Sequence, residues 1–295
     1  MIMRKKLGWK IVKGAVLGMM LSTAAAAGAW ADTLTPITFN PGGSNPSLTD
    51  LQDSTFKADN FIVGDYAVAH ISNTTGAFDE SGYLKFTQAQ LGSDFIHPAG
   101  FNDTPGDGSY ALYIFFNANG SLNSFQGNTA NGSTYSGSFS SLSYQLYGDP
   151  GNNDQFQATL SGLTPAQPPA GDVLLGSGGL LPHGTNNVTL TFGNNGPIPG
   201  AAVDLTFSLS PGEQGFITSP NTSKFAIELL SSFINNPGVS KFQSVDGTTT
   251  LAINGGGGQI ATAATRIHVP EPASLALIGS GLLGLGMVRS RRKCA

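Results

Sequence analysis

The chain has 295 residues, of which 40 are glycine and only one is cysteine. All 18 acidic residues lie between Asp32 and Glu271, where only five of the 14 basic residues are found, so that stretch carries a formal charge of −13. This balance argues against nucleic acid and anionic membrane surfaces as partners, because no basic patch exists to recruit them. The single Cys294 lies outside the stretch, which excludes an internal disulfide, a thiolate metal site and a thiol nucleophile there.

The N-terminal segment has the three parts of a secretory signal. A basic region contains Arg4, Lys5 and Lys6, an apolar region covers residues 15–21, and Ala29 and Ala31 form an A-x-A cleavage site. This order predicts a signal helix within residues 1–31 that uses the Sec translocon and is removed by signal peptidase. The alternative is an N-terminal anchor that stays uncleaved.

Residues 32–268 are predicted to form one acidic, β-rich body. Turn sequences rich in Gly, Pro, Asn and Asp divide this stretch into short pieces. Between the turns the apolar period is two, which predicts strands at 61–71, 83–88, 110–117, 142–147, 155–160, 188–192, 203–209 and 260–269. The strand at 110–117 is apolar on both faces, as is typical of a central strand. Only residues 224–234, with Phe225, Leu229, Leu230 and Phe233, have helical spacing and predict one short helix.

The predicted fold class is all-β and antiparallel. Many short strands without a fixed-period repeat favour a closed or a two-layered architecture, and we prefer a β-sandwich-like body. The Pro-rich residues 164–171 could divide the body in two, but a loop within one domain is the preferred interpretation.

No motif in the body predicts catalysis, a cofactor or a metal centre. His70, His97, His183 and His268 are scattered, without the spacing of a zinc ligand set. Two alternatives stay open. A glycosidase needs two carboxylates, for which the candidates are Asp79 with Glu80, Glu213 and Glu228. A calcium site needs clustered oxygen ligands, which two turns offer: Asn102, Asp103 and Asp107 in one, and Asp149, Asn152, Asn153 and Asp154 in the other.

The C-terminal tail at 269–295 has three ordered parts. The first part, 269–272, contains Pro270, Glu271 and Pro272. The two prolines keep this segment extended, and therefore accessible to a protease. Residues 273–288 are uncharged and apolar, which predicts a short transmembrane helix. The basic residues of 289–295 place the C-terminus in the cytoplasm: Arg289, Arg291, Arg292 and Lys293. The alternative is a plain anchor that stays attached.

These three parts resemble the PEP-CTERM sorting signal of exported proteins in Gram-negative bacteria that make extracellular polysaccharide. The resemblance implies a transient anchor in the inner membrane and cleavage near the motif by an exosortase, a membrane-embedded cysteine protease.

Short segments of the body, among them residues 56–60, 82–84, 110–113 and 255–258, resemble the flocculation-associated PEP-CTERM proteins, which have no assigned catalytic residue. We therefore expect a noncatalytic protein of the cell surface or extracellular matrix that associates with exopolysaccharide in flocs or biofilm. The alternatives are a polysaccharide-acting enzyme and a calcium-dependent carbohydrate-binding module.

Overall fold

The computed structural model describes residues 36–50, 54–181, 186–193, 199–211, 215–219, 225–233 and 240–262. All of these residues belong to one compact unit. The predicted signal at 1–31 and the predicted tail at 269–295 lie outside them. No helix in the described ranges combines the length and the apolar character that crossing a membrane requires.

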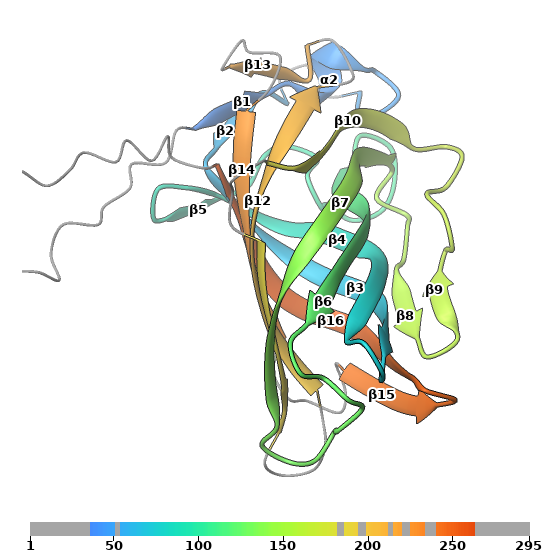
Figure 1. The fold of residues 1–295 in the computed structure, drawn as a ribbon. Helices are drawn as coiled ribbons and strands as arrows, with labels where there is room; N and C mark the ends of the chain where they lie inside the picture. Colours follow the sequence, from blue (N-terminus) through green and yellow to red (C-terminus); the bar gives the residue numbers. More distant parts are fainter. Residues whose placement is uncertain are drawn as a thin grey trace, which may run out of the picture. The chain divides into compact units, whose positions relative to one another are not determined.

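Within the described residues, one large sheet contains eleven antiparallel strands (Figure 1). The path of pairing runs β12-β11-β7-β6-β4-β3-β16-β14, and β14 pairs back to β12, so these strands close into a ring. In addition, β10 pairs with β7 and β12, β5 with β4, and β15 with β16. The bounds are β3 (Asn60–Ser72), β4 (Ala77–Leu91), β5 (Asp94–Ile96), β6 (Tyr110–Leu122), β7 (Thr134–Pro150), β10 (Val173–Leu180), β11 (Asn186–Phe192), β12 (Pro199–Pro211), β14 (Phe225–Phe233), β15 (Ser240–Val245) and β16 (Thr248–Thr262).

Strand β6 shows how the two faces of the closed sheet differ. Leu112, Ile114 and Phe116 belong to the main hydrophobic core. Tyr113 and Phe115 alternate with them and belong to a smaller cluster on the opposite face. Because the sheet closes, the main core lies on its inner face and the smaller cluster on its outer face. Both faces of this strand are buried, which is why its sequence is apolar throughout.

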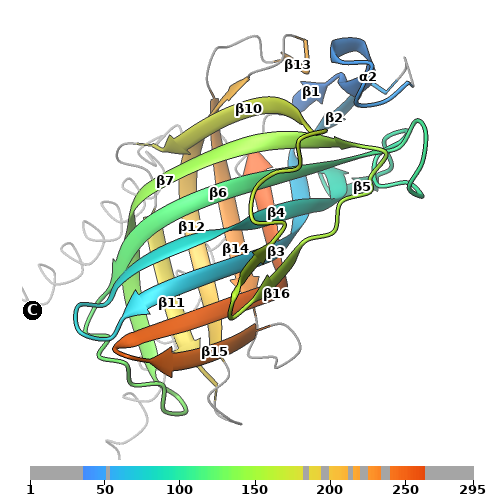
Figure 2. The same ribbon diagram turned by 90° about the vertical axis from the view of Figure 1, so that its right-hand side faces the viewer.

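A small sheet at one end of the closed sheet adds aromatic rings to the inner core (Figure 2). It contains β13 (Ile217–Ser219), β1 (Ile37–Phe39) and β2 (Phe56–Ala58), in that order. Phe39 stacks on Phe56 with 5.1 Å between ring centroids and meets Phe216 edge-on at 5.6 Å. The one-turn helix α2 (Pro41–Ser44) follows β1, and Asn40 caps it by accepting a hydrogen bond from the Gly43 amide.

The segment 151–172, here called the flap, crosses the outer face. It contains the hairpin β8 (Gln157–Thr159) and β9 (Gly162–Thr164). The hairpin contacts β3, and β8 also contacts β16, so the flap runs from the end of β7 across its neighbours before the chain returns to β10 (Figure 2). Two apolar side chains of the flap, Phe156 and Leu163, pack in the outer cluster.

The all-β, antiparallel prediction is confirmed, and the predicted strands from 61–71 to 203–209 each fall on an observed one. The strand predicted at 260–269 overlaps β16 only at 260–262, because β16 begins at Thr248, and the residues beyond Thr262 lie outside the described ranges. Of the closed and two-layered arrangements, the pairing follows the closed one rather than the preferred sandwich. The pairing of β12 with β14 closes the sheet. The apolar periodicity of the sequence locates strands but does not show which of them pair.

The predicted helix at 224–234 is wrong, because this segment forms β14. Phe225, Leu229 and Phe233 are four residues apart, and this spacing falls on one side of a strand as well as of a helix. Its backbone pairs with β12 on one side and β16 on the other. The apolar spacing of this segment is compatible with a strand as well as with a helix, and backbone pairing on both sides stabilises the strand.

Candidate functional site

An aromatic cluster on the outer face lies beneath the flap. Tyr83 of β4 and Tyr113 of β6 are fully buried. The ring of Phe156, in the flap, stacks on Tyr83 with 4.3 Å between centroids and 16° between planes. Tyr147 of β7 stacks on Tyr113 at 5.4 Å. Burial and stacking of these rings hold the flap against the sheet.

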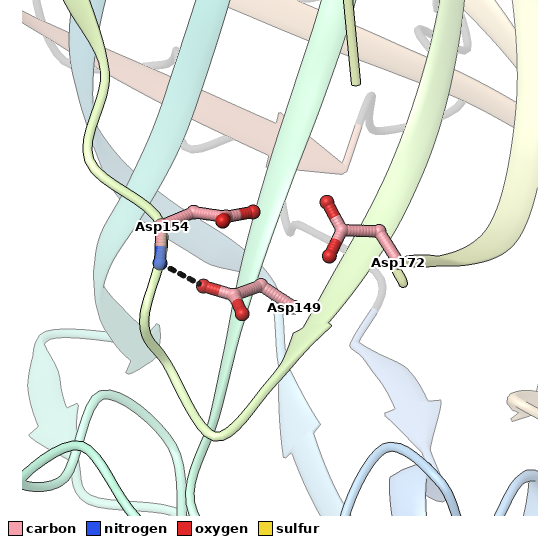
Figure 3. A group of neighbouring side chains, drawn as sticks. All are labelled: Asp149, Asp154 and Asp172. Carbon is pink, nitrogen blue, oxygen red and sulfur yellow. Dashed lines mark hydrogen bonds between the residues drawn. The ribbon is translucent and has the colours of Figure 1, made fainter. Parts of the chain in front are cut away.

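Three aspartates gather beside this cluster and are called the outer triad (Figure 3). Asp149 is next to the last residue of β7, Asp154 lies in the first turn of the flap, and Asp172 directly precedes β10. One carboxylate oxygen from each lies within 4.8 Å of those from the other two. The triad therefore joins the sheet to both ends of the flap.

Backbone and phenol groups position two members of the triad. Asp149 is 1% exposed, and one of its oxygens accepts a hydrogen bond from the Asn153 amide at 3.3 Å. The other accepts one from the Asp154 amide at 3.0 Å (Figure 3). The turn can wrap around this carboxylate because Gly151 and Asn152 have φ of 81° and 48°, a region that glycine and asparagine tolerate. The hydroxyl of Tyr113 donates to Asp172 Oδ2.

Lys85 of β4 brings one positive charge to the triad. Its Nζ donates to Asn152 Oδ1 at 3.3 Å and to the backbone oxygen of Asp154 at 3.2 Å. Within the described part of the chain, no ion pair joins this ammonium to a triad carboxylate, although its charge lowers the pKa of Asp149. Three carboxylates and one ammonium leave an excess of negative charge.

The pKa values reflect this excess. The pKa of Asp172 is raised to about 7: burial is the largest cause, the Tyr113 hydrogen bond opposes it, and the neighbouring carboxyls of Asp154 and Asp149 add to it. Burial also raises the pKa of Asp149, and the amide hydrogen bonds and Lys85 oppose that rise. The neighbouring carboxylates therefore disfavour one another's ionised form.

Two buried polar atoms beside the triad have no hydrogen-bond partner. One is Oδ2 of Asp154, and the other is the hydroxyl of Tyr83, whose side chain is 0% exposed. The charges of Asp154 and Asp172 raise the pKa of Tyr83 after burial, so this hydroxyl lies in their field. A buried polar atom without a partner is unfavourable by about 1–3 kcal/mol.

The other predicted calcium turn is arranged differently. Asn102 points its amide at backbone oxygens of β4, and Asp103 Oδ2 accepts a hydrogen bond from Gly100. Asp103, Asp107 and Asp50 line a hollow of about 400 Å³. Among the described residues, only the triad brings three potential metal-ligating side chains within 4.8 Å of one another.

The paired-carboxylate candidates for glycoside hydrolysis do not meet in one site. Asp79 and Glu80 are consecutive in β4, so they face opposite sides of the sheet. Glu80 pairs with Ala69 and Ala118, both members of the inner core, and therefore faces inward. Glu213 lies outside the described residues, and the side chain of Glu228 is not described.

Glu80 of β4 and Asp65 of β3 are two carboxyls that face the inner core and are here called the inner pair. Asp65 is 6% exposed and pairs with Leu84 of the inner core, so it also faces inward. Burial raises the pKa of Glu80 to about 8, and the charge of Asp65 adds to the rise.

Sequence reasoning found two of the three members of the outer triad. It grouped Asp149 with Asp154, but it missed Asp172 because the whole hairpin separates that residue from the turn. It also missed Lys85 and Tyr83. One signal could have found them. Tyr83 and Lys85 are two residues apart in a predicted strand, so their side chains lie on the same face, and a lysine is rare in this acidic body.

The similarity to known proteins lies in the C-terminal tail. Residues 268–293 match the PEP-CTERM protein-sorting motif. The motif predicted at 269–295 is thus confirmed, and it implies an exosortase as the processing partner and export toward the cell envelope. No curated protein and no solved structure matches the chain.

The individual sorting residues lie outside the described ranges, so their roles stay predictions. They are Pro270, Glu271 and Pro272 for processing, Arg289, Arg291, Arg292 and Lys293 for orientation, and Ala29 and Ala31 for signal cleavage.

Proposed function

We propose that this chain is a noncatalytic protein of the cell surface or extracellular matrix that associates with exopolysaccharide and promotes flocculation or biofilm cohesion. In this proposal Sec exports the chain, residues 273–288 anchor it transiently in the inner membrane, and an exosortase releases the acidic body. The PEP-CTERM match at 268–293 is the observation that carries the proposal.

The chemistry of the body supports a role in a matrix. Between Asp32 and Glu271 the chain has 18 acidic and five basic residues, a balance that keeps an exported protein soluble. Divalent cations can bridge such a surface to an acidic polysaccharide. The resemblance of body segments to flocculation-associated proteins is the reason for placing the partner in the matrix.

A strain that lacks the gene tests the function. We expect lost aggregation with unchanged amount and chain length of the polysaccharide, and recovery when the wild-type chain is supplied. A variant in which Pro270, Glu271 and Pro272 are alanine should not restore aggregation, because its body stays attached. Pro168→Ala/Pro169→Ala, which changes two prolines of the flap, is the matched control and should restore it.

The enzyme alternative predicts a different phenotype. If the chain acts on polysaccharide, deletion should change the chain length or the linkage composition of the polymer. Unchanged aggregation in the deletion strain would contradict the matrix role.

The calcium-dependent carbohydrate-binding module is a second candidate, which the outer triad favours. Its distinguishing property is glycan binding that disappears in chelator and returns with calcium. Glycan binding that persists in chelator would exclude it and leave the matrix role standing.

A further inference from the structure

We propose that Asp149, Asp154 and Asp172 bind one divalent cation, calcium, and that this ion fastens both ends of the flap to strand β7. The inference concerns the body itself and does not rest on the proposed function.

The spacing of the triad fits the coordination sphere of calcium. Calcium binds oxygen ligands at 2.3–2.6 Å, so two ligands on opposite sides of the ion lie about 5 Å apart. The three carboxylate oxygens lie within 4.8 Å of one another, so all three can belong to one such sphere. Magnesium demands near-octahedral geometry at 2.0–2.1 Å and keeps several of its waters, so the more adaptable sphere of calcium suits a set of three carboxylates better.

The charges around the triad also favour a cation. Lys85 donates to two neutral oxygens, Asn152 Oδ1 and the Asp154 backbone oxygen, rather than to a carboxylate. The triad and Lys85 together carry two more negative than positive charges when ionised, which one divalent ion neutralises. A hard cation with oxygen ligands is the chemistry that this set offers, since it contains no sulfur and no imidazole.

A second observation points to a ligand independently of the carboxylates. The hydroxyl of Tyr83 is fully buried, has no hydrogen-bond partner and lies in the field of Asp154 and Asp172. A water molecule in the coordination sphere of a cation at the triad would donate a hydrogen bond to this phenol oxygen. The buried, unpartnered Oδ2 of Asp154 would become a ligand in the same step.

The position of the triad predicts what the ion does. Asp149 belongs to the sheet, whereas Asp154 and Asp172 lie at the start and at the end of the flap. An ion bound to all three closes the flap as a loop on the outer face, over the rings of Tyr83 and Tyr113. Calcium should therefore stabilise the flap more than any other part of the body.

Calorimetric titration of the full chain in detergent, first stripped with chelator, tests the site. We expect saturable binding of one calcium ion per chain, and a Tm increase of about 5 °C when free calcium is about 100 times Kd. Asp172→Asn keeps the side-chain size but removes a ligand charge, and it should weaken binding about tenfold or more. Lys85→Met should tighten binding, because it removes the competing ammonium.

Asp107→Asn is the matched control, since it removes one exposed acidic charge from the other turn and should leave calcium affinity unchanged. Absence of saturable binding, or equal weakening in Asp107→Asn and Asp172→Asn, would overturn the proposal. If Asp172→Asn does not fold, hydrogen exchange of the wild-type chain decides. Calcium should slow amide exchange at 151–172 and leave 102–109 unchanged, and equal exchange rates at 151–172 with and without calcium would also overturn it.

Discussion

The outer triad and the inner pair are two groups of carboxylates on opposite faces of one sheet. The triad lies at the end of β7, where turn amides, Lys85 and phenol hydroxyls surround it. The inner pair lies in the middle of β3 and β4, where Glu80 pairs with Ala69 and Ala118 and Asp65 pairs with Leu84, all members of the core. Both groups have a carboxyl whose pKa burial raises, to about 7 for Asp172 and about 8 for Glu80.

The difference shows how surroundings decide what an acidic group can bind. The triad has oxygen ligands from three segments, and two of them, Asp154 and Asp172, are partly exposed. The inner pair offers two carboxylates among apolar side chains, so burial favours the protonated form there. Acidic groups of similar composition thus suit a cation on one face and a proton on the other.

Removing the ring that packs the flap against Tyr83 should have the largest effect. Phe156→Ala deletes the side chain that stacks on Tyr83, which should destabilise the fold by about 3–5 kcal/mol. Urea unfolding measures this loss, and hydrogen exchange should show that the flap opens while β3 stays protected. Leu163→Ala, which removes a partly buried side chain of the same cluster, is the control and should have a smaller effect. Equal exchange in the flap of Phe156→Ala and wild type would show that the ring does not hold it.

Neutralising the inner pair should have a smaller, pH-dependent effect. The pKa of Glu80 is raised in the folded state, so the folded protein binds the proton more tightly than the unfolded chain. Its stability should fall as the pH rises from about 4.5 to about 8, and no further above that. Glu80→Gln should remove this fall and be a few kcal/mol more stable than wild type at pH 8–9, with similar stability near pH 4.

Thermal melts across this pH range measure the effect of Glu80→Gln. Asp79→Asn is the control, because Asp79 precedes Glu80 in the strand but is exposed. A pH profile of Glu80→Gln that parallels the wild type would contradict the inward placement of this carboxyl.

Removing one hydroxyl from the triad should have the smallest effect. Tyr113→Phe loses the hydrogen bond to Asp172, which should cost about 1 kcal/mol of stability. Because that bond favours the ionised carboxylate, its loss should raise the pKa of Asp172. NMR titration of the aspartate carboxyl carbons measures the shift, and Tyr135→Phe, remote in the sequence, serves as the control. A lower pKa of Asp172 in Tyr113→Phe would contradict the geometry.

Much of the fold could be predicted from local pattern, and the exceptions have physical reasons. The period of two located β6 and β11, because alternating burial is written directly into a strand. It could not locate β14, whose four-residue spacing suits a helix as well, nor the pairing of β12 with β14, which depends on contacts between distant segments.

The candidate site divides in the same way. The turn at 149–154 was visible because Asp149, Asn152 and Asp154 are neighbours in sequence. Asp172 and Lys85 joined them only through the crossing of the flap and the pairing of β4, β6 and β7. The sorting motif needed no fold at all, since its three parts are consecutive.

Intact-mass spectrometry of the protein in the culture supernatant tests the central claim of an exported, exosortase-processed body most directly. We predict a chain that begins at Asp32 and ends near Pro270, Glu271 and Pro272, without the basic residues of 289–295. A secreted or envelope-bound chain that still ends in Ala295 would contradict the claim.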